Sequence, residues 1–196
     1  MNAPMTPQFA INYLWIIWAA SWLIAAFWSD RSAKRPGLRA ELLYRVVTFA
    51  GVALLFGVFT RSYRGPWRLW YFDSGINWVL CAICALGFAF CWWARLHLGR
   101  LWSGWVSKKE GHRIIDTGPY AIVRHPIYTG IILSAFATAA MKGTAFALLG
   151  AAVMTLGFWI KARLEERFLR SELGAQSYDA YRRRVPMLVP FGPKAA

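Results

Sequence analysis

Five long apolar segments constrain the fold of this chain more than any other feature of its sequence. They cover residues 9–28, 42–60, 76–94, 127–141 and 144–160. A transmembrane helix needs about 20 apolar residues to cross a hydrocarbon core of about 30 Å. The first three segments approach this length. The last two are shorter and are joined only by Lys142-Gly143, so we expect this hairpin either to tilt or to stop short of crossing. The pattern predicts an all-α integral membrane protein with about five transmembrane helices.

The distribution of positive charge predicts how these helices are oriented. Only 16% of the residues are charged, against about 25% in an ordinary globular chain. If the C-terminal tail is cytoplasmic and every segment crosses, 19 of the 23 Lys and Arg residues lie on the cytoplasmic side. This bias places the N-terminus outside and the C-terminus inside. It also accounts for the net charge of +14, so we predict no nucleic-acid partner. The N-terminus has no basic region before its apolar run, which indicates a retained span rather than a cleaved signal peptide.

Two regions follow from this layout. Residues 1–94 hold transmembrane helices 1–3, and residues 95–196 hold a cytosolic loop, the helical hairpin 127–160 and the C-terminal helices and tail. The fifth segment is expected to continue as a polar helix that ends near Gly174, a residue type that favours helix C-termini. A second short helix is then predicted to carry Tyr178 and Tyr181 and to end before Pro186.

Polar residues are concentrated just before the fourth segment. Pro126 suits the first turn of a helix, so Arg124 and His125 are expected to project just outside its start. Gly118-Pro119 is a turn signal that brings Tyr120 near the same place, and Tyr128 follows one turn into the helix. A helix N-terminus suits an anionic group of a ligand. The alternative is an interfacial belt of Arg and Tyr that anchors the helix, but polar groups beside hydrocarbon favour a binding site.

Glu165 and Glu166 form a second candidate, because they are two of only nine acidic residues and follow a membrane segment. One alternative is a solvated helix in which they pair with Lys161, Arg163 and Arg167. In the other, one carboxylate faces inward and binds a cationic group of a ligand.

The sequence predicts no metal site. His97, His112 and His125 have no carboxylate or cysteine at metal-ligand spacing. Cys81, Cys84 and Cys91 lie within one apolar segment, where we expect them to act as small packing residues. There is also no glycine-rich nucleotide loop and no Gly-x-Ser-x-Gly motif.

Taken together, these motifs resemble the isoprenylcysteine carboxyl methyltransferase family of integral membrane methyltransferases, in its short prokaryotic form. The resemblance runs from about residue 95 to about residue 190. It is carried by Leu98-Gly99-Arg100-Leu101-Trp102-Ser103, His112-Arg113-Ile114-Ile115-Asp116-Thr117-Gly118-Pro119-Tyr120, Arg124-His125-Pro126-Ile127-Tyr128-Thr129-Gly130, Glu165-Glu166 and Tyr178-Asp179-Ala180-Tyr181-Arg182-Arg183-Arg184-Val185-Pro186.

The resemblance implies a cytosolic pocket for S-adenosylmethionine, formed by the loop before the fourth helix and by the C-terminal helices, with S-adenosylhomocysteine as product. Glu165 would bind the methionine ammonium, with Glu166 as the substitute. The basic residue for the acceptor falls near Lys161, with Arg124 and Arg163 as rivals, and these three are the catalytic candidates. The cofactor-binding candidates implied are His112, Arg113, Ile114, Ile115, Gly118, Tyr120, His125, Pro126, Tyr128, Glu165 and Glu166.

The function implied by this resemblance is S-adenosylmethionine-dependent methylation, like that of a carboxyl O-methyltransferase, in a bacterial inner membrane. The acceptor would be a lipophilic or prenylated molecule that reaches the site from the surrounding lipids, and it could be a carboxylate, a thiol or an amine. A carboxylate is already ionised at pH 7 and needs no general base. Two alternatives are an NADPH-dependent sterol-type reductase of related fold and a membrane scaffold without catalytic activity.

Overall fold

The computed structural model describes residues 5–27, 32–34, 38–57, 67–99, 102, 108–109 and 114–194. Within these ranges the chain is mainly helical. The helices are α1 (Pro7–Ala26), α2 (Leu38–Phe56), α3 (Ser74–Leu98), α4 (Pro119–Ile122), α5 (Pro126–Lys142), α6 (Ala145–Leu173) and α7 (Ala175–Arg184). Two short antiparallel strands, β1 (Ser32–Lys34) and β2 (Lys108–Lys109), pair with each other.

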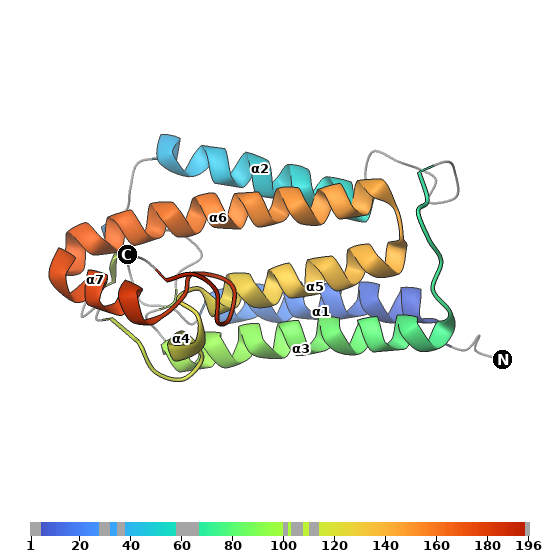
Figure 1. Ribbon diagram of the computed structural model, residues 1–196, viewed down its shortest axis with the longest axis horizontal. Helices are drawn as coiled ribbons and strands as arrows, with labels where there is room; N and C mark the ends of the chain where they lie inside the picture. Colours follow the sequence, from blue (N-terminus) through green and yellow to red (C-terminus); the bar gives the residue numbers. More distant parts are fainter. Residues whose placement is uncertain are drawn as a thin grey trace.

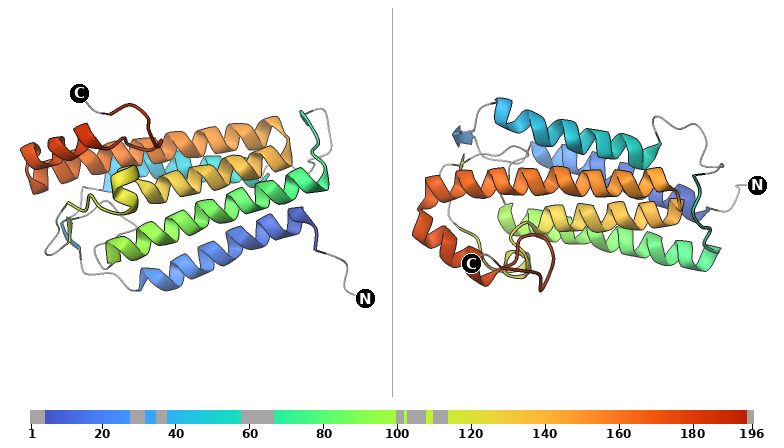
Figure 2. Two further views of the ribbon diagram at one scale, coloured as in Figure 1. Left: turned by 60° about the horizontal axis from the view of Figure 1, so that its bottom comes forward. Right: turned by 45° about the horizontal axis from the view of Figure 1, so that its top comes forward.

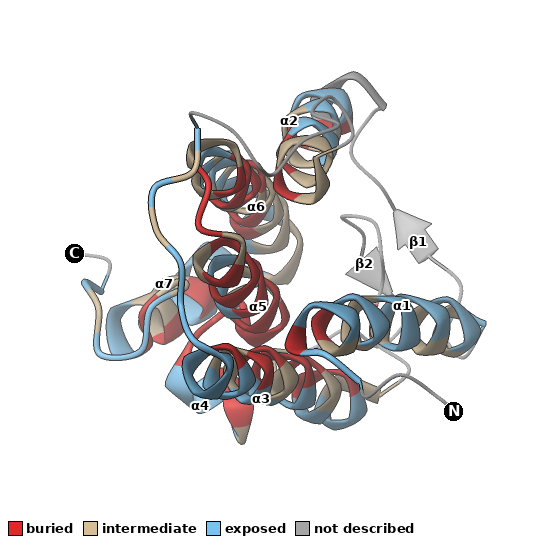
Figure 3. Ribbon diagram, turned by 90° about the vertical axis from the view of Figure 1, so that its right-hand side faces the viewer, coloured by how far each residue is buried: buried red, intermediate tan, exposed pale blue. Residues whose placement is uncertain are grey.

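The five long helices run side by side as one elongated bundle (Figure 1). α6 packs against both α2 and α5, and α3 packs against both α5 and α1. Viewed from the end, the buried residues lie mainly on α3, α5 and α6, whereas α1 exposes much of its surface (Figure 3). The short helices α4 and α7 lie together at one end of the bundle, beside the start of α5 (Figure 2).

Three of the helices, α1, α3 and α6, are long and apolar enough to cross a membrane. α5 has 17 residues, or about 25 Å of helix, which is less than the hydrocarbon core of about 30 Å. α2 has 19 residues, with Glu41 in its first turn. The three long helices agree with a membrane protein, whereas five complete spans and the orientation of the termini stay predictions.

Glycines bring the long helices into close contact. A Cβ atom at Gly51 of α2 would lie 2.5 Å from the backbone nitrogen of Met154 in α6 and 2.9 Å from the carbonyl oxygen of Gly150. Gly87 of α3 and Gly130 of α5 face each other in the same way. Helices in membranes associate through such small residues because no hydrophobic effect drives them together there.

The boundaries predicted near the C-terminus are confirmed. α6 continues past the apolar segment to Leu173 and is followed by Gly174 at φ +97°. α7 carries the buried side chains of Tyr178 and Tyr181 and ends before Pro186. Between α5 and α6, Gly143 adopts the left-handed conformation, with φ +59°. The three cysteines are free and buried in α3, as expected for packing residues.

A buried arginine ties two helices together where α1 and α3 end. The Arg95 guanidinium donates hydrogen bonds to the carbonyl oxygens of Ala25, at 2.9 Å, and Gly99, at 2.6 Å. It also lies 4.3 Å from the ring centroid of Trp102. Arg95 thereby fixes the ends of α1 and α3 next to the cavity described below.

Candidate functional site

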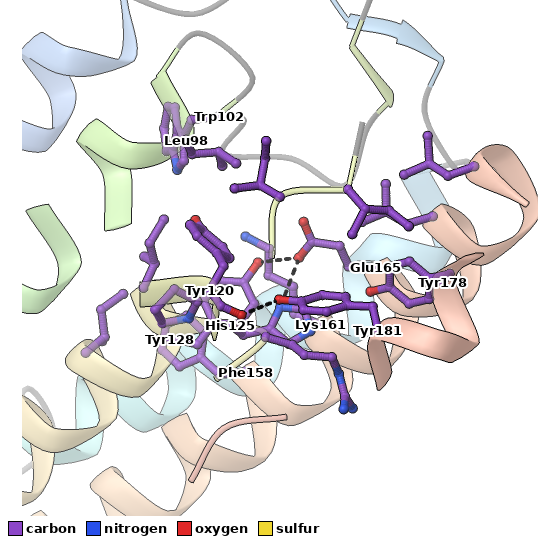
Figure 4. A pocket seen from close by; sticks show the side chains of 18 of the residues that line it. Leu98, Trp102, Tyr120, His125, Tyr128, Phe158, Lys161, Glu165, Tyr178 and Tyr181 are labelled. Atoms are coloured by element: carbon purple, nitrogen blue, oxygen red, sulfur yellow. Dashed lines mark hydrogen bonds and ion pairs between the residues drawn. The ribbon is translucent and has the colours of Figure 1, made fainter. Parts of the chain in front are cut away.

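A cavity of about 370 Å³ lies at the end of the bundle where α4 and α7 meet the long helices (Figure 4). Ligand pockets commonly have volumes of about 300–1,000 Å³. One wall is apolar and comes from α1, from α3 and from Trp102, which comes after α3 in the sequence. The other wall carries polar groups from α4, α5, α6 and α7 and from the residues just before α5. The apolar wall includes Trp22, Leu23, Ala26, Leu98 and Trp102, and the polar wall includes Tyr120, Arg124, His125, Tyr128, Lys161, Glu165, Tyr178 and Tyr181.

The start of α5 is held in place by the segment that follows α7. His125 is the N-cap of α5 and Pro126 occupies its first turn, as the sequence predicts. The backbone N–H of Arg124 donates to the carbonyl oxygen of Pro186, at 2.8 Å, and that of His125 donates to Met187, at 3.1 Å. These two N–H groups are therefore bonded within the protein.

Glu166 anchors this region from within. Its side chain is 5% exposed, and its Oε1 accepts a hydrogen bond of 2.7 Å from the Nε of Arg124. The Nε2 of His125 lies 3.2 Å from the same oxygen, and the Nε of Arg182 lies 3.4 Å from Oε2. Glu166 does not line the cavity. Its partners come from other elements, rather than from Lys161, Arg163 or Arg167 on its own helix.

Arg124 lines the cavity, but its guanidinium also binds protein groups. Besides Glu166, it donates through Nη1 to the carbonyl oxygens of Arg182, at 3.1 Å, and Val185. Only 3% of its side chain is exposed. A role in joining α5, α6 and the end of α7 follows directly from these contacts, and its role toward an acceptor stays a prediction.

Glu165 faces the cavity. Its Oε2 accepts a hydrogen bond of 2.7 Å from the hydroxyl of Tyr128 and lies 3.8 Å from the Nδ1 of His125. A quarter of its side chain is exposed. The rings of His125 and Tyr128 are stacked 5.3 Å apart, and the ring of Phe158 stacks on Tyr128 at 5.2 Å. Figure 4 shows Glu165 beside this group of rings.

Lys161 is the basic residue of α6 that lines the cavity. Its Nζ lies 5.1 Å from the ring centroid of Tyr128 and 5.5 Å from that of Tyr44. Arg163 lies elsewhere: it is exposed, and its guanidinium is 5.6 Å from the ring of Trp159. Of the two, the geometry brings only Lys161 to the cavity.

Tyrosines close the cavity on the side of α4 and α7. The Tyr181 hydroxyl donates a hydrogen bond of 2.8 Å to the carbonyl oxygen of Tyr120. Burial raises the pKa of Tyr120, Tyr178 and Tyr181. A phenol with its ordinary pKa of about 10 is already neutral at pH 7, and burial favours that form further.

The loop before α4 has only some of its predicted residues in the described part of the chain. Ile114 and Ile115 line the cavity. Gly118 does not, but its φ is +57°, and a Cβ there would lie 2.7 Å from the ring of His97. His112 and Arg113 lie outside the described residues. Among the residues that the structure does describe, no three His, Cys, Asp or Glu side chains come together as a metal site.

Several residues that line the cavity or support its wall were not predicted from the sequence. Trp22 on α1 and Phe158 on α6 belong to apolar segments in which every aromatic residue looks alike. Arg182, which pairs with Glu166, belongs to a run of three arginines. Tyr181 was predicted to lie in the short C-terminal helix and belongs to the motif that ends at Pro186, but it was not predicted to line a cavity. Only tertiary structure distinguishes these residues from their neighbours.

Comparison with known proteins relates part of the chain to a known family. Residues 78–171 match the model of the isoprenylcysteine carboxyl methyltransferase (ICMT) family. We call this part of the chain, just under half of its length, the ICMT segment because of its similarity to that family. The ICMT segment contains α5, most of α3 and nearly all of α6, and it confirms the resemblance seen in the sequence. It begins earlier than expected, within α3, and ends before α7.

Curated relatives agree with this assignment. The chain is 51% identical over 71 residues to methanethiol S-methyltransferase 2 of Bradyrhizobium diazoefficiens, covering 36% of this chain and 26% of the relative. It is 32% identical over 87 residues to protein-S-isoprenylcysteine O-methyltransferase B of Arabidopsis thaliana, covering 44% of each. It is 29% identical over 155 residues to the cobalt-zinc-cadmium resistance protein CzcN of Cupriavidus metallidurans, covering 74% of this chain and 60% of the relative. The chain thus spans between about a quarter and three-fifths of the length of these relatives.

Proposed function

We propose that the protein is a methyltransferase that uses S-adenosylmethionine and acts on a lipophilic acceptor in the membrane. The observation that carries the proposal is the partly exposed carboxylate of Glu165, a residue of the ICMT segment that lines the cavity and accepts a hydrogen bond from the Tyr128 hydroxyl. Two of the relatives above are named as methyltransferases. The relatives do not favour the reductase or the scaffold.

The residues of the cavity fit the proposed cofactor. An ionised carboxylate forms strong hydrogen bonds with an ammonium group, and Glu165 is the acidic side chain among those that line the cavity. The stacked rings of His125, Tyr128 and Phe158 offer aromatic faces, to which cations are attracted. When bound, S-adenosylmethionine supplies an electrophilic methyl group on a positively charged sulfur.

The chain's own groups would then bind and orient the cofactor and the acceptor and would exclude water from the cavity. Tyr128 holds Glu165 in position through its hydroxyl. Trp22 and Trp102 on the apolar wall suit the lipid part of an acceptor. Methyl transfer disperses charge in the transition state, so a dry, well-aligned site favours it. Lys161 is our candidate for binding an acidic acceptor, because its side chain lines the same cavity. Arg124 would support the polar wall of the cavity, because its guanidinium is bound to Glu166.

Calorimetric titration of detergent-purified protein tests this function. We expect S-adenosylhomocysteine to bind and NADPH not to bind. Binding of NADPH alone would favour the reductase instead. Failure of both to bind would remove the cofactor on which the proposal depends.

A further inference from the structure

The segment that follows α7 runs alongside the first turn of α5, where both views place it next to the bundle (Figures 1 and 2). The carbonyl oxygens of Pro186 and Met187 accept hydrogen bonds from the backbone of Arg124 and His125. The hydroxyl of Thr129, in the first turn of α5, donates a hydrogen bond of 2.6 Å to the carbonyl oxygen of Leu188. Residues 186–188 are therefore fixed against the start of α5, just before the turn described next.

The turn that follows places a large apolar side chain in an unfavourable backbone conformation. The Gly192 N–H donates a hydrogen bond of 2.9 Å to the carbonyl oxygen of Val189. This bond closes a turn with Pro190 and Phe191 at its centre. Phe191 has φ +61° and is the described non-glycine residue with positive φ. Proline followed by a residue of positive φ is the pattern of a type II turn, in which glycine is preferred at the second position. A phenylalanine there costs conformational free energy.

Hydrogen bonds hold the turn, but the Phe191 side chain does not pack against any of the described residues. The side chain of Phe191 is 100% exposed, and that of Val189 is 64% exposed. Exposed apolar groups that gather at one place generally mark a surface of interaction. The two apolar side chains are therefore available for contact with a surface outside the described residues.

Position and charge identify the surface that these side chains meet. α5 carries exposed apolar side chains further along, at Leu133 and Phe136, so the turn lies at the margin of an apolar surface. Exposed basic residues stand on both sides of it, Arg183 before and Lys194 after. In segments that lie in a membrane interface, apolar side chains such as Phe insert at the boundary of headgroups and acyl chains, and basic side chains there attract anionic headgroups.

We propose that residues 187–192 form an interfacial anchor, in which Val189 and Phe191 insert below the lipid headgroups. The same segment carries the carbonyl oxygens that hold Arg124 and His125 at the cavity. Contact with lipid at the turn thus supports the position of the cavity wall. This proposal concerns the surface of the protein and does not depend on the proposed methyltransferase activity.

Site-directed spin labelling tests the anchor. Phe191→Cys protein is labelled and reconstituted at one copy per nanodisc, in phosphatidylcholine and phosphatidylglycerol. The three native cysteines are buried, and the wild-type chain treated in parallel gives their background labelling. Accessibility to oxygen, which concentrates in hydrocarbon, is compared with accessibility to a water-soluble nickel chelate. Leu133→Cys on exposed α5 surface is the lipid reference, and Ser177→Cys on exposed α7 surface is the aqueous reference.

We expect the oxygen-to-nickel ratio at position 191 to be at least about threefold higher than at position 177, as for an apolar group in the interface. A ratio equal to that at 177 would overturn the proposal, because the turn would lie in water. Shielding from both reagents would also overturn it, since protein would then cover the turn. Val189→Cys gives a second position if labelled Phe191→Cys protein does not fold.

Discussion

Glu165 and Glu166 are adjacent residues of α6 with different surroundings. Glu166 is buried and bound by Arg124, with His125 and Arg182 close by. Glu165 is partly exposed to the cavity and accepts a hydrogen bond from Tyr128. An inward-facing carboxylate that binds a ligand was one of the two alternatives predicted from the sequence, the other being a solvated helix with ion pairs along it. The geometry favours Glu165 for this role and gives Glu166 a structural one.

Glu165→Gln is expected to weaken binding of S-adenosylhomocysteine by at least about 1.5 kcal/mol, the lower range for a hydrogen bond to a charged group. This corresponds to an increase of about tenfold in Kd. Calorimetry measures the effect, with Glu172→Gln as the matched control on the same helix, outside the cavity lining. Unchanged affinity in Glu165→Gln protein would rule out the proposed contact with the ammonium group.

Glu166→Gln is expected to lower the free energy of unfolding by about 3 kcal/mol, because breaking a buried ion pair leaves an uncompensated charge. The charge left behind is that of Arg124. Denaturant unfolding in detergent measures the loss. Asp116→Asn, which removes the partner of the exposed Arg184, serves as control and is expected to change stability little. Equal stability of the two variants would contradict the structural role of Glu166.

At the scale of helices, local signals explain what could be predicted from the sequence. The hairpin turn at Gly143, the end of α6 before Gly174 and the end of α7 before Pro186 all depend on the conformational preferences of single residues. The apolar segments likewise locate the long helices, because their length matches a membrane. The polar residues before α5 predicted a site at this place, and the structure has a cavity there.

The remaining features depend on contacts between distant segments, which the sequence alone does not reveal. The pairing of Arg124 with Glu166 joins α6 to the residue before α5. The contribution of Trp22 depends on the packing of α1 against α3. The carbonyl oxygens of Pro186 and Met187, which hold the start of α5, belong to a segment without periodic sequence. No local pattern specifies any of these contacts.

Gly51→Ala is expected to destabilise the packing of α2 on α6 by about 1–3 kcal/mol, the usual cost of an oversized side chain in a close-packed contact. Its Cβ would meet the backbone of Met154, which cannot move without displacing the helix. Thermal unfolding in detergent measures the change. Gly75→Ala is the control, because the nearest atom to its Cβ, at 3.1 Å, is on the Asp73 side chain. A Gly51→Ala protein as stable as the control would contradict the close approach of the two helices.

At the scale of the whole molecule, the cavity and the polar helix α7 lie at one end of the bundle (Figure 1). The distribution of basic residues predicts that this end is cytoplasmic. Such a placement would give the cavity access to a water-soluble cofactor on one side and to lipids on the other.

Reporter fusions after Ala196 test this orientation. With the C-terminus in the cytoplasm, a fused green fluorescent protein is expected to fluoresce and a fused alkaline phosphatase to be inactive, because the phosphatase needs the oxidising periplasm for its disulfides. Fusions after Gly143 are the comparison, since they end at the opposite end of the bundle from α7. Phosphatase activity after Ala196 without fluorescence would reverse the predicted orientation.

The most direct test of the whole account is transfer of a radiolabelled methyl group. Purified protein in nanodiscs is incubated with methyl-labelled S-adenosylmethionine and lipophilic carboxylic acids, thiols or amines, and label is counted in the organic phase. We expect label in at least one acceptor class, reduced by at least about tenfold in Glu165→Gln protein, in line with loss of a charged contact. No transfer to any class, or equal transfer by the wild-type and Glu165→Gln proteins, would contradict the account.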